Sequence, residues 1–187
     1  MGQTGIPLAE VARNWLRREN KKLYRDFNFE RKEAEWELVG ELLCQCPFQA
    51  AFIWQHHITW YAAELDKTEF LRLRVIDGPA DSSWRKLSPD NTIRGAAKRI
   101  IESELPDTFE DIDVAHIKRL ADSFETTTHE ERLTLFQPDP GEASIVVDGN
   151  HYSTAKAIHQ IRSGAYDPQP VYLGVRQDCT IHDDGYS

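Results

Sequence analysis

The sequence predicts an α+β protein with α/β elements, in which a helical N-terminal part packs on a small mixed sheet. Apolar residues recur at helical spacing through the first 45 residues, and short β-branched runs alternate with further helical stripes from residue 70 onward. Of the 187 residues, 40% are hydrophobic, so the chain is long enough and apolar enough to form a core without metals or disulfides.

The chain divides by composition into a helical N-terminal region over 1–66, an α/β domain over 67–176 and a polar C-terminal tail over 177–187. Residues 1–60 carry eight acidic and eight basic side chains, so the net charge of −9 arises entirely after them. An acidic domain argues against broad nonspecific binding to duplex DNA, since Lys and Arg contacts to phosphate dominate that affinity.

Three helices are expected in the N-terminal region. Pro7 opens the first, whose apolar face is formed by Leu8, Val11, Ala12, Trp15 and Leu16 with Arg and Lys opposite. The second is expected over about 31–44. Pro47 suits the first turn of the third, expected over about 47–65 and largely buried because it is apolar on most sides.

Strands and helices are expected to alternate in the remaining chain. Residues 70–76 alternate like a half-buried strand, and Asp90 or Asn91 is expected to cap the following helix. Asp113 caps another helix. Strands are then expected at 133–136, 144–147 and 170–175, with a helix over about 153–163 ending at Gly164; the strand–helix–strand order over 144–175 favours parallel pairing.

Three cysteines, Cys44, Cys46 and Cys179, indicate a reducing, cytoplasmic setting, because their number is odd and the first two are too close for an ordinary bridge. The first residues do not resemble a signal peptide, and the longest largely apolar stretch, 46–53, is too short to span a bilayer. No membrane partner is therefore expected.

The segment Asp148-Gly149-Asn150-His151 is the strongest candidate for a functional site. It joins a β-branched run to an amphipathic helix, and the N–H groups at a helix start suit an anion such as phosphate. The alternative is a tight turn in which Asp and Asn serve as caps. Ser153 is expected to be a cap and Lys156 to be solvated.

Residues 112–175 resemble the ParB N-terminal/sulfiredoxin-like superfamily. Residues 117–124 look like the helix before its first hairpin, and residues 148–151 resemble its Asp-Gly-x-His-Arg box. The resemblance implies a phosphate-binding site for ATP or CTP, in which Gly149 lets the backbone approach the phosphate and His151 donates to a phosphate oxygen. The N–H groups of Ser153 and Thr154 support it, and Asp148 orients His151 or meets a metal-bound water.

This chain departs from the superfamily at two positions of the box. Asn150 stands where sulfiredoxins have the catalytic Cys, so reduction of sulfinic cysteine is not expected. Tyr152 replaces the Arg that follows the His, and a tyrosine cannot make the bidentate charged contact of an arginine.

The functional prediction is a nucleotide- or phosphate-ligand-binding protein, either with kinase or nucleotide hydrolase activity or without it. The expected ligands are Asp148, Gly149, Asn150, His151, Ser153 and Thr154, with Mg²⁺ accompanying ATP or CTP. His151 and Asp148 are the catalytic candidates, no base is assigned, and no metal-ligand set is expected. The alternatives are a noncatalytic interaction protein whose helical N-terminal region recruits a protein partner, and a ParB-like nuclease.

Three further patterns have structural interpretations. His56-His57, expected on a helix, would point about 100° apart and form no metal clamp, and Cys44-x-Cys46 lacks the spacing of a zinc or redox site. The segment 129–131 is expected to be a solvated acidic turn, with a place near the box as its alternative.

Overall fold

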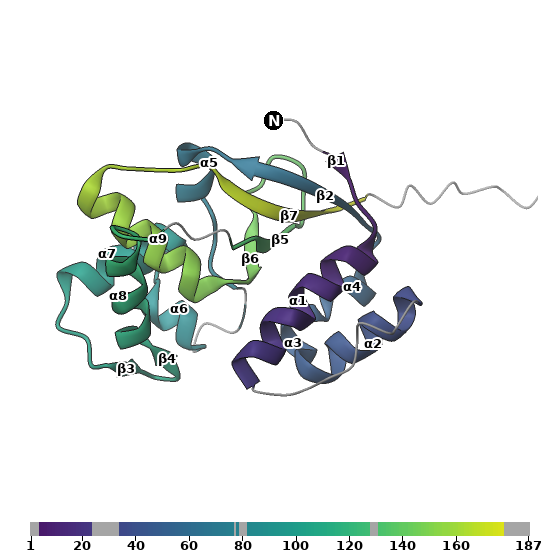
Figure 1. The fold of residues 1–187 in the computed structure, drawn as a ribbon, viewed down its shortest axis with the longest axis horizontal. Coiled ribbons are helices and arrows are strands. Elements are labelled where there is room, and N and C mark those ends of the chain that lie inside the picture. Colours follow the sequence, from purple (N-terminus) through teal and green to yellow (C-terminus); the bar gives the residue numbers. More distant parts are fainter. Residues whose placement is uncertain (1–3, 24–33, 77, 79–81, 128–130, 178–187) are drawn as a thin grey trace, which may run out of the picture.

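A mixed sheet of five strands, in the order β1-β2-β7-β5-β6, lies at the centre of the molecule (Figure 1). The structure, a computed structural model, describes residues 4–23, 34–76, 78, 82–127 and 131–177. The strands are β1 (Thr4–Gly5), β2 (Ile58–Leu65), β5 (Leu133–Gln137), β6 (Ile145–Asp148) and β7 (Gln169–Arg176), while β3 (Thr108–Phe109) and β4 (Ile112–Asp113) form a separate small sheet. The expected α+β class is confirmed.

Strand pairing differs from the expectation in one respect. β5 and β6 form an antiparallel hairpin, and β7 pairs with β5 in parallel and with β2 antiparallel. The parallel pairing expected between the strands at 144–147 and 170–175 is therefore wrong. The short connection of the hairpin places β6 at the edge beside β5, and the helix after β6 returns the chain to the other side of β5.

Helices cover both faces of the sheet. On one side lie α1 (Leu8–Leu23), α2 (Glu35–Gln45), α3 (Pro47–Ala50) and α4 (Phe52–Gln55); the other group comprises α5 (Lys67–Leu71), α6 (Ser83–Leu87), α7 (Ile93–Glu102), α8 (Val114–Ser123) and α9 (Asn150–Ser163). The helical N-terminal part packs on the sheet as expected.

Alternate residues of the central strands supply two separate cores. In β5, Leu133 and Leu135 face the cluster that includes α7, α8 and α9, whereas Phe136 faces the cluster of α1 and α2. In β7, Leu173 and Tyr172 divide in the same way. Because side chains alternate across a strand, a sheet covered on both faces reads as an almost continuous apolar run, which explains the composition of residues 133–136 and 145–147.

The long third helix expected over 47–65 is wrong. The chain forms two single turns, α3 and α4, and then β2, which pairs with β7 along its whole length. Phe48 and Trp54 are exposed rather than buried, while Trp60 on β2 lies in the core. The helical region 1–66 thus also contributes strands to the sheet.

The strand expected over 70–76 is also wrong, because helix α5 covers its first residues. Asp66 begins α5 with a reciprocal capping box, in which its carboxylate accepts from the Glu69 amide and the Glu69 carboxylate accepts from the Asp66 amide, both at 2.9 Å. After α5, Arg74 forms isolated bridges with Thr92 and Ile145 in place of a regular strand. Phe70 is fully buried from the helix.

The remaining helix boundaries follow local capping. Asp113 caps α8 as expected, accepting from the His116 amide at 2.7 Å, and Gly164 ends α9 with a φ of 75°. The cap of α7 is Thr92, whose hydroxyl accepts from the Gly95 amide, rather than Asp90 or Asn91. Among the described helices, none combines the length and the apolar character that crossing a bilayer requires.

Candidate functional site at the start of helix α9

The turn between β6 and α9 requires glycine at position 149. Gly149 has a φ of 104°, a conformation that L side chains rarely adopt. A Cβ at this position would lie 2.5 Å from Leu133 Cδ2 and 3.2 Å from Arg18 Nη2. Gly149 therefore lets β5 and α1 approach the start of the helix closely.

Helix α9 begins at Asn150, three residues before the expected start, and the Asn150 side chain fixes that start. Its Nδ2 donates to the Val146 carbonyl at 2.8 Å, and its Oδ1 accepts from the Ile76 amide at 3.0 Å. The Asn150 carboxamide thus joins β6 to the segment after α5. These two bonds favour a structural role for a side chain that the sequence placed among the ligands.

Ser153 and Thr154 do not lie at the open end of the helix. The Ser153 amide donates to the Gly149 carbonyl at 2.8 Å, which is the first hydrogen bond of α9, and both side chains are fully buried. The expectation that the N–H groups of these two residues face a phosphate is therefore wrong. The amides that precede the first helical bond belong to Asn150, His151 and Tyr152.

Asp148 is held by an arginine from the other end of the chain. Arg18 of α1 places Nη1 3.2 Å from Asp148 Oδ2 and Nη2 3.2 Å from Glu131 Oε2, and it also donates to the Arg132 carbonyl. The Asp148 side chain is 4% exposed and that of Arg18 is 15% exposed. Asp148 therefore orients Arg18 at the cavity wall, and the sequence did not reveal this partner.

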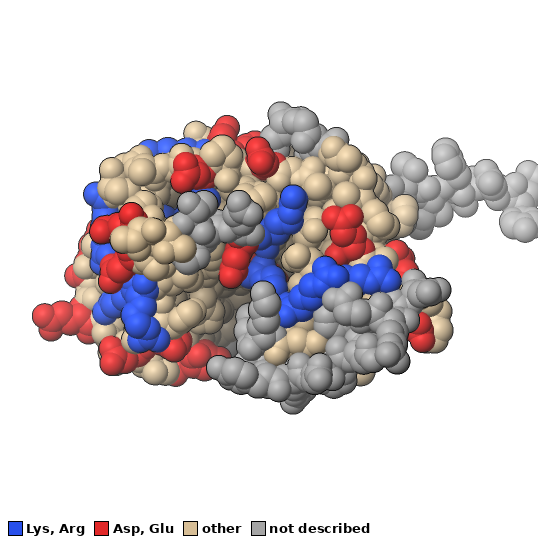
Figure 2. Space-filling model, viewed as in Figure 1, with Lys and Arg blue, Asp and Glu red and all other residues tan. Residues whose placement is uncertain are grey.

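A cavity of about 390 Å³ opens at this point between α1, α8 and the first turn of α9. Figure 2 shows a hollow on this side of the molecule, with basic side chains along its upper edge. Its lining residues are Asn14, Arg18, His116, Leu120, Glu131, Arg132, Gly149, Asn150, His151 and Tyr152. Gly149, Asn150 and His151 of the box thus line a concave site, in which two arginines and two histidines meet one carboxylate, while Asp148 is not among the lining residues.

The two histidines come from different helices. The rings of His151 and His116 lie 6.3 Å apart, and Trp84 meets the His151 ring edge-on at 5.2 Å. His116 was not recognised as a site residue from the sequence, because it lies on the exposed side of a helix whose apolar stripe was the only visible signal. Glu131, expected in a solvated acidic turn, lies at the cavity, and His129 and Glu130 lie outside the described residues.

Tyr152 is a core residue at the back of the cavity. It is buried, and Phe124 meets its ring edge-on at 5.4 Å. Burial, with the Glu131 charge second, raises the pKa of the Tyr152 phenol to about 12. The phenol is therefore neutral near pH 7, and positive charge at this cavity comes from Arg18 and Arg132.

The other candidates lie elsewhere. The expectation that Lys156 is solvated is wrong, because the residue is buried and lines a different cavity. His56 ends α4 and stacks on Phe136, His57 is exposed, and neither is on a regular helix. In the part of the chain that the structure describes, no group of three His, Cys, Asp or Glu is arranged to hold a metal ion. Cys46 is buried and Cys44 is exposed.

Comparisons of the chain with protein-family models, with curated proteins and with solved structures found no match. The resemblance to the ParB N-terminal/sulfiredoxin-like superfamily therefore stays a prediction, carried by the residues of the box and the order of elements around it.

Proposed function

We propose that the cavity at the start of α9 binds the phosphate groups of a small molecule, with ATP and CTP as the ligands to test first. One observation carries the proposal: the first turn of α9 faces a cavity whose wall holds Arg18, Arg132, His116 and His151. Helix N-termini and arginine side chains both favour phosphate, through partial positive charge and through charged hydrogen bonds.

Two arginines from outside the box supply positive charge at the cavity, although the box itself lacks the arginine of the superfamily. Arg18 and Arg132 line the cavity, whereas the position after the box histidine is the buried Tyr152. Arg18 is oriented by Asp148 and Glu131, and the Arg132 guanidinium lies 5.2 Å from the centre of the Tyr172 ring. Two guanidinium groups from outside the box offer the charged contact that Tyr152 lacks.

The proposal concerns binding and assigns no catalytic base. Glu131 is the single carboxylate among the described residues lining the cavity, and it is paired with Arg18. These residues do not form a cage for Mg²⁺, since octahedral sites require several oxygen ligands. Magnesium therefore enters the test only as an ion brought by the nucleotide.

Isothermal titration calorimetry with ATP and with CTP, each with and without Mg²⁺, tests the proposal. The expected result is saturable heat that Arg132→Gln and His151→Ala each weaken at least about tenfold, which corresponds to one lost hydrogen bond to a charged group. The matched controls are Arg94→Gln and His57→Ala, which change exposed residues outside the cavity. Absence of heat with both nucleotides contradicts the proposal, and release of ADP or CDP in the same samples measures turnover.

A second candidate function, protein–protein recognition by the N-terminal helices, is supported by exposed aromatic side chains. Trp36 is 71% exposed, Phe48 90% and Trp54 65%. Large exposed aromatics are typical of interaction surfaces. Light scattering of the wild type and of a Trp36→Ser, Phe48→Ser, Trp54→Ser variant tests self-association. A monomer that also captures no partner in a pull-down contradicts this function.

The nuclease alternative gains no support from the cavity. Metal-dependent cleavage of DNA commonly uses paired carboxylates, and the described lining residues contain only Glu131. A plasmid-nicking assay with Mg²⁺ or Mn²⁺ tests this alternative; cleavage that His151→Ala abolishes would establish it.

A further inference from the structure

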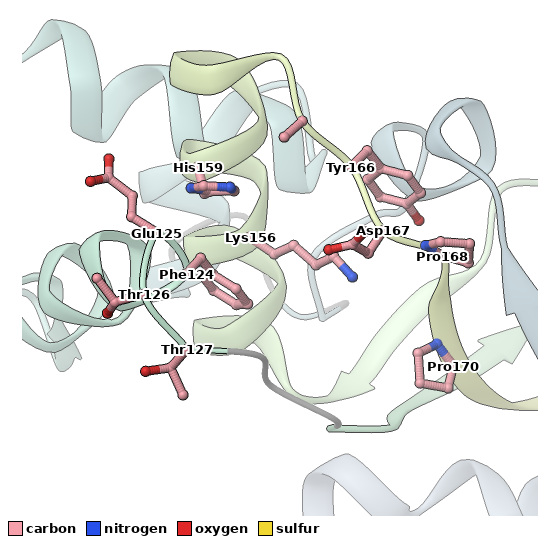
Figure 3. A pocket seen from close by; sticks show the side chains of 11 residues that line it. Phe124, Glu125, Thr126, Thr127, Lys156, His159, Tyr166, Asp167, Pro168 and Pro170 are labelled. Atoms are coloured by element: carbon pink, nitrogen blue, oxygen red, sulfur yellow. The ribbon is translucent and has the colours of Figure 1, made fainter.

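A second cavity, of about 370 Å³, lies between α9, the end of α8 and the segment that leads into β7 (Figure 3). It shares no lining residue with the cavity at the start of α9. Its lining residues are Phe124, Glu125, Thr126, Thr127, Lys156, His159, Ala165, Tyr166, Asp167, Pro168 and Pro170. Figure 3 shows the Lys156 side chain extending from α9 toward Tyr166 and Asp167.

Lys156 is a buried amine in the wall of this cavity, and the acceptor of its hydrogen bond is a neutral amide. The residue is 8% exposed, and its Nζ donates to Gln169 Oε1 at 2.9 Å. The Nζ also lies 5.1 Å from the centre of the Tyr166 ring. Buried lysines are rare unless an opposite charge or a function retains them, so this side chain requires an explanation.

The acceptor of Lys156 is fixed in orientation. Gln169 is fully buried, and its Nε2 donates to the Glu131 carbonyl at 2.6 Å and to the Pro170 carbonyl at 2.9 Å. Both amide hydrogens are therefore used, and only the Oε1 remains to face Lys156. The amine is thus held at one place in the cavity wall by a rigid neutral group.

Burial lowers the pKa of Lys156 to about 8, while the Asp167 charge acts in the opposite direction. Glu125, His159 and Tyr166 are the other titratable groups that line the cavity. Burial raises the pKa of Tyr166, so its phenol stays neutral. Near neutral pH a larger share of Lys156 is therefore uncharged than of an ordinary lysine, whose pKa is about 10.4.

We propose that this second cavity binds a small uncharged aldehyde or ketone and that Lys156 Nζ joins it as an imine. The two carboxylates in the lining, Glu125 and Asp167, disfavour an anionic ligand, whereas a neutral amine attacks a carbonyl carbon. This inference does not depend on phosphate binding at the start of α9.

The reaction is balanced without a further reactant. The Nζ lone pair forms a bond to the carbonyl carbon as the C=O π bond breaks, and one of the two Nζ protons passes to the oxygen to give a neutral carbinolamine. The C–O bond then breaks, the hydroxyl leaves as water with the second Nζ proton, and the C=N bond remains. The two protons that leave Nζ are the two that the departing oxygen carries away as water, so no further reactant is consumed.

Reductive trapping on the folded wild-type protein tests the proposal. Glycolaldehyde serves as the probe, and sodium cyanoborohydride converts any imine into a stable hydroxyethyl mark that peptide mass spectrometry locates. At pH 7.5 Lys156 is expected to be marked at least about tenfold faster than the exposed Lys98, since more of its amine is neutral, although burial slows access. Marking of Lys156 no faster than Lys98 overturns the proposal.

Two variants sharpen the result. Lys156→Arg keeps the positive charge and removes the nucleophile, so the fast phase of marking is expected to disappear; Lys98→Arg is the matched control and leaves it unchanged. A fast phase that persists in Lys156→Arg also overturns the proposal. Because the site is located by mass spectrometry in the wild type, the outcome does not require either variant to fold.

Discussion

The ion pair between Arg18 and Asp148 gives the sharpest prediction about the site. Their charged atoms lie 3.2 Å apart, with the Asp148 side chain 4% exposed. At an effective dielectric constant of about 20, direct attraction at this distance is about 5 kcal/mol, and desolvation of both groups offsets more than half of it. We therefore expect a net coupling of about 2 kcal/mol.

A double-mutant cycle measures this coupling. Arg18→Gln leaves a buried carboxylate without its charged partner and is expected to cost about 3 kcal/mol of unfolding free energy. Asp148→Asn is expected to cost about 1 kcal/mol, because Arg18 retains Glu131 and the Arg132 carbonyl. The double variant is then expected to lose about 2 kcal/mol rather than the additive 4 kcal/mol.

Urea denaturation at pH 7 and low salt, followed by far-UV circular dichroism, is the assay. Glu131→Gln serves as the control, since the Glu131 side chain is 52% exposed and its pair with Arg18 is expected to contribute less than about 1 kcal/mol. A coupling within about 0.5 kcal/mol of zero would refute the reasoning that Asp148 anchors Arg18.

Three further predictions concern α9. Gly149→Ala is expected to lower the free energy of unfolding by about 3 kcal/mol, because of backbone strain and contact with Leu133. The control Gly141→Ala, at a φ of 84° with no atom within 4 Å of its Cβ, is expected to lower it by only about 1 kcal/mol in the same urea assay. Equal losses in the two variants would contradict the packing argument. Asn150→Ala is expected to cost about 2 kcal/mol, because two buried backbone groups lose their partner, and a change below about 0.5 kcal/mol would show that the clamp is dispensable. Because the pKa of Lys156 is lowered in the folded state, the folded state binds fewer protons than the unfolded state above pH 8. Raising the pH from 7 to 9.5 is therefore expected to stabilise the wild type by about 2 kcal/mol relative to Lys156→Met. Parallel pH profiles of stability for the two proteins would contradict this prediction.

The elements predicted correctly are those whose local signals agree with their packing. α1 and α8 have clear apolar stripes, and Asp113 and Gly164 give caps at the right positions. The hairpin of β5 and β6 follows from two apolar runs around a Pro-Asp-Pro-Gly turn.

The elements predicted wrongly had ambiguous patterns. The run at 52–65 is apolar on most sides, and periodicity alone cannot separate a buried helix from a buried strand. Pairing with β7 decides it, and that pairing involves residues more than 100 positions away. At 66–69 the capping box Asp66–Glu69 is a usable sequence signal for α5, whereas the alternation that follows it favours a strand.

Three residues of the box at 148–151, namely Gly149, Asn150 and His151, line a cavity. Their position between a strand and a helix is a local property that the sequence shows. By sequence Arg18 belongs to the polar face of α1, and its separation of 130 positions from Asp148 leaves no local signal of their pairing. Lys156 was expected in solvent by its residue type, whereas packing of α9 against Phe70 and Tyr166 buries it.

A crystal structure of the protein soaked with ATP and Mg²⁺ tests the central claim most directly. The account predicts phosphate density within hydrogen-bond distance of the amides of the first turn of α9 and of the Arg132 guanidinium. An empty cavity at a nucleotide concentration that saturates any calorimetric signal, or nucleotide bound at another surface, would contradict it.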